Sequence, residues 1–288
     1  MTVLGAIALP QLQPERLPAI AAAAEQSGLA ELWLWEDCFW ASGSACAATV
    51  LAHTERLRVG IGVLPAPLRN VALTAMEVAA LLRMHPGRVI PGLGHGVQEW
   101  MGQVGARVDS PLTLLREQLT ALRALLHGET VDASGRYVQL DRVGLDWPPG
   151  TPPPLVAGAS GPKTLRLSGE LADGTVLTSS TTPDGIRAAR RLIDEGRAKA
   201  GRTEPHNVIV YLLTVTGPDA TERLAAARHR AALPDTVGVA GDADAVAEAV
   251  HRWSAAGADT VVLEPAPDEP DPIDFVRFAG EQVRPLVE

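Results

Sequence analysis

The chain has 288 residues, of which 46% are hydrophobic, and it carries a formal net charge of −9. Nucleic-acid-binding proteins show a basic patch or stripe, and anionic membrane surfaces attract basic clusters, so we expect neither partner for this chain. The length suits one large domain over residues 1–288, since α/β barrels run to about 250 residues.

The first apolar run, VLGAIAL, predicts a strand rather than a targeting segment. No positive charge precedes it, and Pro10 and Pro14 close it too early for a signal peptide or a membrane span. The two cysteines, Cys38 and Cys46, lack the paired spacing of a metal site and are too few for a disulfide framework. We therefore expect a cytoplasmic protein with reduced cysteines and no bound metal.

Further along the chain, short apolar runs alternate with longer segments whose apolar residues have helical spacing. The runs predict strands at 3–9, 31–35, 57–63, 88–93, 154–157, 175–178, 208–215 and 259–263. The longer segments predict helices near 15–27, 43–53, 71–83, 111–127, 163–172, 184–199, 220–231, 243–256 and 272–286. This alternation predicts an α/β fold, and eight strands in one chain favour a closed (β/α)8 TIM barrel over an open doubly wound sheet.

Residues 128–153 interrupt the alternation. The segment GETVDASGRYVQLDRVGLDWPPGTPP contains turn-forming glycines and ends in a proline-rich stretch. It predicts a short hairpin insertion followed by a rigid connector.

In a barrel of this kind the active face is built from loops that follow the carboxyl ends of the strands. This rule selects residues 36–38, 65–70, 92–99, 158–163 and 179–183.

The segment GLGHGVQEW places His95 between Gly94 and Gly96. It is not the dinucleotide fingerprint G-x-G-x-x-G, because Val97 occupies the third glycine position. Glycines let a ligand approach the main chain closely, and an imidazole titrates near neutral pH. His95 is therefore a candidate proton donor or acceptor, and a surface or capping histidine is the other interpretation.

The segment VAGASGPK ends a predicted strand just where a helix begins, with Pro162 at the first helical position. Free amides of Gly158, Ala159, Ser160 and Gly161, the Ser160 hydroxyl and the charge of Lys163 would together form an anion site. An ordinary strand–helix turn with a serine cap is the alternative.

Glu36 and Asp37 follow the predicted second strand. One of these carboxylates could bind a ligand or hold a proton, and an aromatic pocket would raise its pKa. Capping of a helix, or plain exposure to solvent, is the alternative for both.

Trp33 and Trp35 are expected in the core, whereas Trp40 lies in the following loop and is a candidate for the substrate pocket. Arg69 could bind an anion in the third loop, beside Asn70, which is a helix-capping candidate. The sequence has no H-E-x-x-H, C-x-x-C or G-x-S-x-G motif, so metal-hydrolase and serine-hydrolase chemistry are poorly supported.

Four motifs, in this order, resemble the bacterial-luciferase-like oxidoreductases: VLPAPLRN, GLGHGVQEWMGQVGA, VAGASGPKTLRLSGELADG and VAGDADAVAEAVHRWSAAGADTVVLEP. The resemblance covers nearly the whole chain. It implies a TIM barrel that binds FMN or the deazaflavin coenzyme F420 at the carboxyl ends of its strands. Within the family, the sequence is most similar to the F420-dependent group.

The resemblance also implies roles for individual residues. Gly158, Ala159, Ser160 and Gly161 match the segment that holds the cofactor phosphate, with Thr178 and Ser179 nearby. Gly62 and Val63 match a non-prolyl cis peptide behind the cofactor ring in many relatives. His95 and Gln98 stand where some relatives have glutamate and asparagine, and Glu36 and Asp37 match an acid–histidine pair. The aspartate at 37 departs from that pattern and leaves the substrate class open.

The leading hypothesis is therefore an oxidoreductase that transfers a hydride between F420 and a small organic substrate, with His95 moving the proton. An FMN-dependent monooxygenase that receives reduced flavin from a separate reductase is the alternative, and a non-catalytic flavin carrier is a third. The resemblance also implies a homodimer, for which the sequence offers apolar-rich helices near 15–27 and 71–83.

Overall fold

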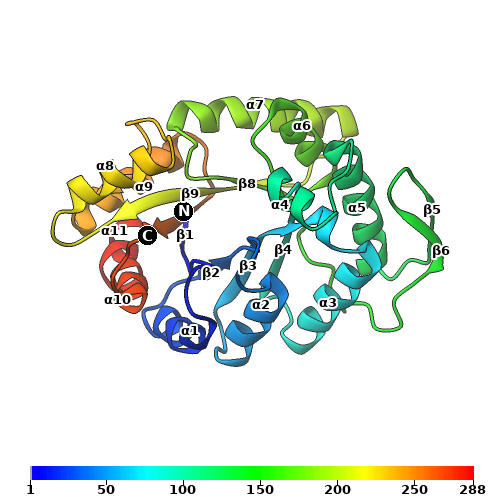
Figure 1. Ribbon diagram of the computed structural model, residues 1–288, viewed down its shortest axis with the longest axis horizontal. Coiled ribbons are helices and arrows are strands. Elements are labelled where there is room, and N and C mark those ends of the chain that lie inside the picture. Colours follow the sequence, from blue (N-terminus) through cyan, green and yellow to red (C-terminus); the bar gives the residue numbers. More distant parts are fainter. Residues whose placement is uncertain (1) are drawn as a thin grey trace.

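The computed structural model describes residues 2–288 and confirms the barrel (Figure 1). Eight parallel strands close it in chain order, because β9 pairs with both β8 and β11. The barrel strands are β1 (Val3–Ile7), β2 (Glu31–Leu34), β3 (Arg58–Pro65), β4 (Val89–Gly94), β7 (Val156–Gly158), β8 (Gly174–Leu177), β9 (Asn207–Val215) and β11 (Thr260–Pro265). A short strand, β10 (Val239–Ala240), pairs with the end of β9.

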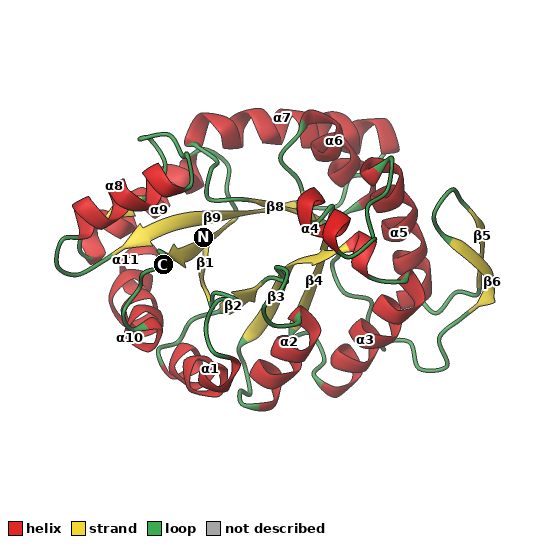
Figure 2. Ribbon diagram, viewed as in Figure 1, coloured by secondary structure: helices red, strands yellow, loops and turns green. Residues whose placement is uncertain are grey.

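The helices surround the strands, as Figure 2 shows. They are α1 (Leu17–Gln26), α2 (Gly43–Ala52), α3 (Val71–Met84), α4 (Gln98–Gln103), α5 (Pro111–Leu126), α6 (Pro162–Leu171), α7 (Pro183–Ala200), α8 (Ala220–Arg230), α9 (Ala243–Ala255), α10 (Pro272–Arg277) and α11 (Arg284–Val287). The expected final helix is divided, since a π-helical stretch, Phe278–Val283, joins α10 to α11. Among residues 2–288, none of the helices has the length and apolar character needed to cross a lipid bilayer.

Both faces of each strand are covered, which explains why the strands read as nearly continuous apolar runs. Residues that alternate along the strands fill the barrel interior, including Trp33, Tyr211 and Val262. The opposite faces pack against the helices. Trp33 is fully buried, as expected, and its ring lies over Gly60, where a Cβ atom would collide with it.

The insertion is a hairpin of β5 (Val131–Ser134) and β6 (Gln139–Val143), as expected, and it projects beside α5 (Figure 1). Glu117 of α5 holds its turn, because the carboxylate accepts hydrogen bonds from the backbone amides of Arg136, Tyr137 and Val138 at 2.8–2.9 Å. In the connector, the carbonyl of Pro148 accepts a hydrogen bond from Arg83.

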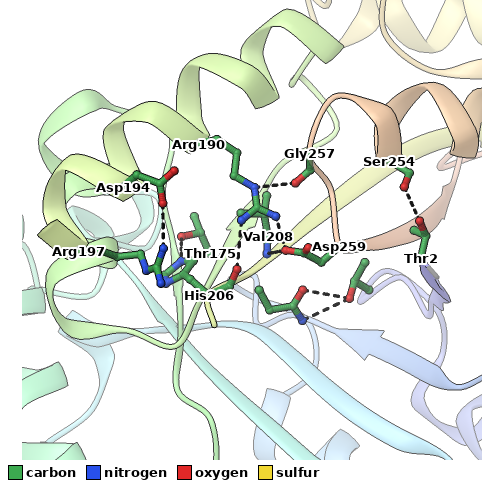
Figure 3. A network of polar contacts seen from close by, with 12 residues as sticks. Thr2, Thr175, Arg190, Asp194, Arg197, His206, Val208, Ser254, Gly257 and Asp259 are labelled. Atoms are coloured by element: carbon green, nitrogen blue, oxygen red, sulfur yellow. Dashed lines mark hydrogen bonds and ion pairs between the residues drawn. The ribbon is translucent and has the colours of Figure 1, made fainter. Parts of the chain in front are cut away.

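The amino-terminal end of the barrel is closed by a polar network (Figure 3). His206 Nε2 lies 2.8 Å from the Thr175 hydroxyl, and Arg190 bonds the carboxylate of Asp259 and the carbonyl of Gly257. Burial, together with the positive charge of Arg197 and other arginines, lowers the pKa of His206 to about 4, so its imidazole is neutral. At this end of a TIM barrel such a network serves stability.

Candidate active site

A cavity of about 480 Å³ opens at the carboxyl-terminal end of the barrel. It brings together ten residues that the sequence singled out: Glu36, Asp37, Gly62, Val63, His95, Gly158, Ala159, Ser160, Thr178 and Ser179. Trp35, Tyr211 and Glu264, which were not expected there, also line it. The volume and the mixed lining are typical of a small-molecule site, for which cavities of about 300–1,000 Å³ are usual.

One end of the cavity is formed by the start of α6. Gly161 is the residue before the helix, and in the described chain no side chain caps its amides, so the serine-capped turn is not formed. Ser160 is exposed at the cavity wall. Unpaired amides at a helix amino terminus form an anion site, and this end of the cavity therefore suits a phosphate group. Lys163 is exposed on α6 and is not among the residues that line the cavity, so it can act only through its charge.

The floor of the cavity is aromatic. The Tyr211 hydroxyl donates a hydrogen bond of 2.8 Å to the carbonyl of Gly62, and the ring of Trp35 stacks on Tyr211 at 5.8 Å between centroids. The peptide bond between Gly62 and Val63 is cis, as the resemblance implies. Trp35 is therefore part of the cavity rather than plain core, which corrects the expectation from sequence.

The glycines around His95 are explained first by packing between strands. A Cβ atom on Gly94 would lie 2.5 Å from Cγ2 of Val63, and one on Gly158 would lie 3.1 Å from Cγ1 of the same side chain. Gly96 has a φ of +66°, a conformation that glycine adopts easily. These glycines thus let β4 and β7 close around Val63 at the cavity wall.

His95 lines the cavity, with one ring nitrogen engaged and the other buried in the protein. Its Nε2 lies 3.0 Å from the Thr164 hydroxyl, whereas Nδ1 is buried and has no partner among residues 2–288. Burial lowers the pKa of His95, and the carbonyl of Pro111 offsets part of this effect, so the ring is neutral at neutral pH. Gln98 does not line the cavity; its amide donates to the carbonyls of His95 and Gly96 and holds the loop in place.

The two acids after β2 have different environments. Glu36 accepts hydrogen bonds from the amide of Gly43 at 2.8 Å and from Arg69 at 2.6 Å, so its carboxylate is already committed to protein partners. Arg69 bonds Glu77 as well and lies outside the cavity lining, which removes it from the substrate pocket. Trp40 is also outside that lining, because it is 52% exposed and its ring meets Trp100 edge-on.

Asp37 and Glu264 are the acids that keep their carboxyl groups at the cavity. Burial raises the pKa of Asp37, and a hydrogen bond of 2.9 Å from the Trp35 indole opposes the shift. Burial also raises the pKa of Glu264 to about 7, with a hydrogen bond from Ser179 opposing and the charge of Asp37 adding to the shift. Glu264 was missed because the predicted strand ended at 263 and the loops after the last two barrel strands were not considered. The rule that selected Glu36 would have found it.

Among residues 2–288, no three His, Cys, Asp or Glu side chains gather in an arrangement that could hold a metal ion. The cavity thus offers an anion site, an aromatic floor and two kinds of proton-exchanging group.

Two curated relatives show what the chain is similar to. A 5,10-methylenetetrahydromethanopterin reductase of Methanolobus tindarius is 34% identical over 207 residues, which are 71% of this chain and 63% of the relative. An F420-dependent glucose-6-phosphate dehydrogenase of Nakamurella multipartita is 30% identical over 211 residues, covering 64% of this chain and 62% of the relative. The chain therefore spans a little under two thirds of the length of these two relatives.

Solved structures share the whole fold. An F420-dependent secondary alcohol dehydrogenase in complex with an F420-acetone adduct superposes with a TM-score of 0.91 and 21% identity, covering 100% of this chain and 99% of that one. The F420-dependent tetrahydromethanopterin reductase of Methanopyrus kandleri has a TM-score of 0.87 and 22% identity, with 100% and 99% coverage. The model of the luciferase-like monooxygenase family matches residues 2–260. Because that match takes in most of the barrel and its cavity, the chain belongs to the luciferase-like monooxygenase family.

Proposed function

We propose that the protein is an oxidoreductase that transfers a hydride between coenzyme F420 and a small organic substrate. The observation that carries the proposal is the cavity itself, in which an uncapped helix start, an aromatic floor and a histidine face one space. These residues fit a deazaflavin with a phosphate-bearing side chain. The relatives and solved structures named for F420 have different substrates, which is why the proposal extends only to a small organic molecule.

In the loop of Gly158, Ala159, Ser160 and Gly161, the amides of Ser160 and Gly161 and the Ser160 hydroxyl would hold the cofactor phosphate. The Ala159 amide already donates to the carbonyl of Val176. Thr178 and Ser179 line the adjoining wall and add hydroxyl donors. The segment Gly62–Val63, fixed by Tyr211, would support the ring from below. Electrostatic attraction from Lys163 would assist from the surface of α6.

When bound, F420 supplies or takes the hydride, and the protein orients it and handles protons. We assign the proton that leaves a substrate hydroxyl to the imidazole of His95. The neutral ring can accept a proton, and the contact of Nε2 with Thr164 fixes its orientation.

An FMN-dependent monooxygenase, served by a separate reductase, is the second candidate. The matching family favours this second candidate, because its members are described as luciferase-like monooxygenases. Both candidates use the same fold, so the cofactor decides between them.

The test is a pair of binding titrations with F420 and with FMN, followed by absorbance and fluorescence. Anaerobic turnover is then measured with propan-2-ol and with glucose 6-phosphate as hydride donors to F420. Tight binding of F420 and its reduction by a donor support the proposal. Binding of FMN without binding of F420, together with oxygen-dependent turnover, would replace it with the monooxygenase.

A further inference from the structure

Glu264 occupies a position that the proposed function does not use. It ends the alternating series Thr260, Val262 and Glu264 on β11, of which Val262 belongs to the interior cluster of the barrel. Its side chain therefore reaches the cavity at the carboxyl-terminal end, and β11 lies two barrel strands away from β2, which Asp37 follows.

Glu264 also lines a second cavity of about 500 Å³, which lies between the loop after β8 and α8. Thr178 and Ser179 are shared with the first cavity, and Leu213 and Leu233 contribute apolar walls. The carboxyl group therefore stands on a wall common to both spaces, with a route toward solvent on its far side.

The ionisable groups around Glu264 favour its neutral form. Asp37 is close enough for its negative charge to act on Glu264, and Tyr211 remains neutral because burial and the nearby carboxylates raise its pKa well above the ordinary value. Arg230 of α8 lines the second cavity, but it pairs with Asp268 at 3.4 Å. Ser179 donates to Glu264 and keeps the shift moderate, so the group can gain and lose a proton near neutral pH.

His95 and Glu264 are thus shifted in opposite directions within one cavity. The pKa of the histidine is lowered and that of the glutamate is raised to about 7, so at neutral pH an unprotonated base and an acid that is about half protonated coexist. Such a divergence is how acid and base roles are divided in known active sites.

We propose that Glu264 is a catalytic acid–base residue of this enzyme, and that the second cavity connects it to solvent. The proposal rests on the proposed function. Oxidation of an alcohol breaks a C–H bond, whose electron pair leaves as hydride to the cofactor, and an O–H bond, whose proton goes to His95. Glu264 then gives its own proton to the reduced cofactor, which the hydride has left with a negative charge, and becomes a carboxylate. It is reprotonated from solvent, and His95 releases the alcohol proton to solvent. Reduction of a ketone runs the same transfers backward.

The first test measures the proton on Glu264 in the protein without cofactor. Infrared spectra of glutamate-labelled protein between about pH 5 and pH 9 report protonated carboxyl groups directly. We expect a carboxylic-acid band that disappears with a midpoint near pH 7 and is absent in Glu264→Gln. In Asp37→Asn the band should persist with a lower midpoint, since a repelling charge has been removed. A Glu264 that is already ionised at the acid end overturns the proposal.

The second test measures the pH dependence of F420 reduction by propan-2-ol, or by glucose 6-phosphate where that is the better donor. Glu264→Gln should lower the rate by about 10²-fold and remove the alkaline limb of the profile, while the affinity for F420 stays unchanged. Glu264→Asp should keep an alkaline limb, and Glu248→Gln, an exposed control on α9, should match the wild type. If Glu264→Gln keeps the full rate and both limbs, Glu264 is not catalytic although the proposed function stands. If neither donor lets the wild type reduce F420, the proposed function fails and this assignment fails with it.

Discussion

Gly94 packs tightly against Val63 at the cavity wall, and Gly94→Ala should damage both the fold and the site. The new methyl group would lie 2.5 Å from Cγ2 of Val63, whereas carbon atoms pack at about 3.5–4.0 Å. Val63 has little room to move, because its other methyl group faces Gly158. A displacement of about 1 Å or more is therefore forced on the strand pair, and overpacking of this kind costs about 1–3 kcal/mol of unfolding free energy.

Urea unfolding and F420 titration would measure the two effects. Gly102→Ala is the matched control, because Gly102 lies in α4 and its nearest neighbour to a new Cβ atom is Arg107 Cδ at 3.9 Å. That variant should be as stable as the wild type or more stable by up to about 1 kcal/mol, since alanine favours helix. Gly94→Ala should lose stability and bind F420 at least about tenfold more weakly, because Val63 shapes the cavity. A Gly94→Ala protein with wild-type stability and affinity would refute the packing explanation for this glycine.

Ser160→Asp should weaken F420 binding by about 100-fold or more without unfolding the protein, since a carboxylate would repel the phosphate at a few ångströms; titration of the folded variant checks this. His95→Gln should slow hydride transfer by about 10²–10⁴-fold and remove the acid limb of the pH profile. Stopped-flow mixing with F420 measures both, and an unchanged rate or an unchanged acid limb would contradict the prediction. Stability should fall by about 3 kcal/mol as the pH drops from 6.5 toward 4, because His206 takes up a proton in the unfolded chain before it can do so in the folded one, and this slope should be missing in His206→Gln. Exposed Leu73 and Met76 on one face of α3 support a homodimer, so light scattering should give about twice the chain mass of 30.3 kDa; a value near 30.3 kDa contradicts it.

Much of the fold could be predicted from sequence because barrel strands are buried on both faces. Runs such as VIVYLLTV in β9 are recognisable for that reason, and glycines and prolines mark where the connections begin. The same regularity located the loops that form the cavity, since all of them follow carboxyl ends of strands. His95, Asp37 and Ser160 came together for this topological reason and needed no knowledge of side-chain direction.

What sequence could not supply was the direction of individual side chains. Trp40 lies in a cavity-forming loop, yet its ring turns outward onto Trp100. Trp35 lies one residue beyond β2 and contributes to the floor of the cavity. Tyr211, in the middle of an apolar strand, is indistinguishable by composition from its core neighbours. Only the alternation of faces along β9, set by its register with β8 and β11, turns it inward.

The buried His206 and the half-buried His95 show why burial by itself does not mark a functional group. His206 and His95 both have lowered pKa values because both are taken out of water. At the amino-terminal end, His206 bonds Thr175 inside a network of arginines and acids (Figure 3), and its environment holds it neutral as part of the packing. At the other end, His95 keeps Nδ1 unpaired within the described chain and stands at a cavity that also contains an acid shifted the opposite way. A side chain that lines an open space, together with a group of complementary protonation state, is what separates the candidate catalyst from the structural residue.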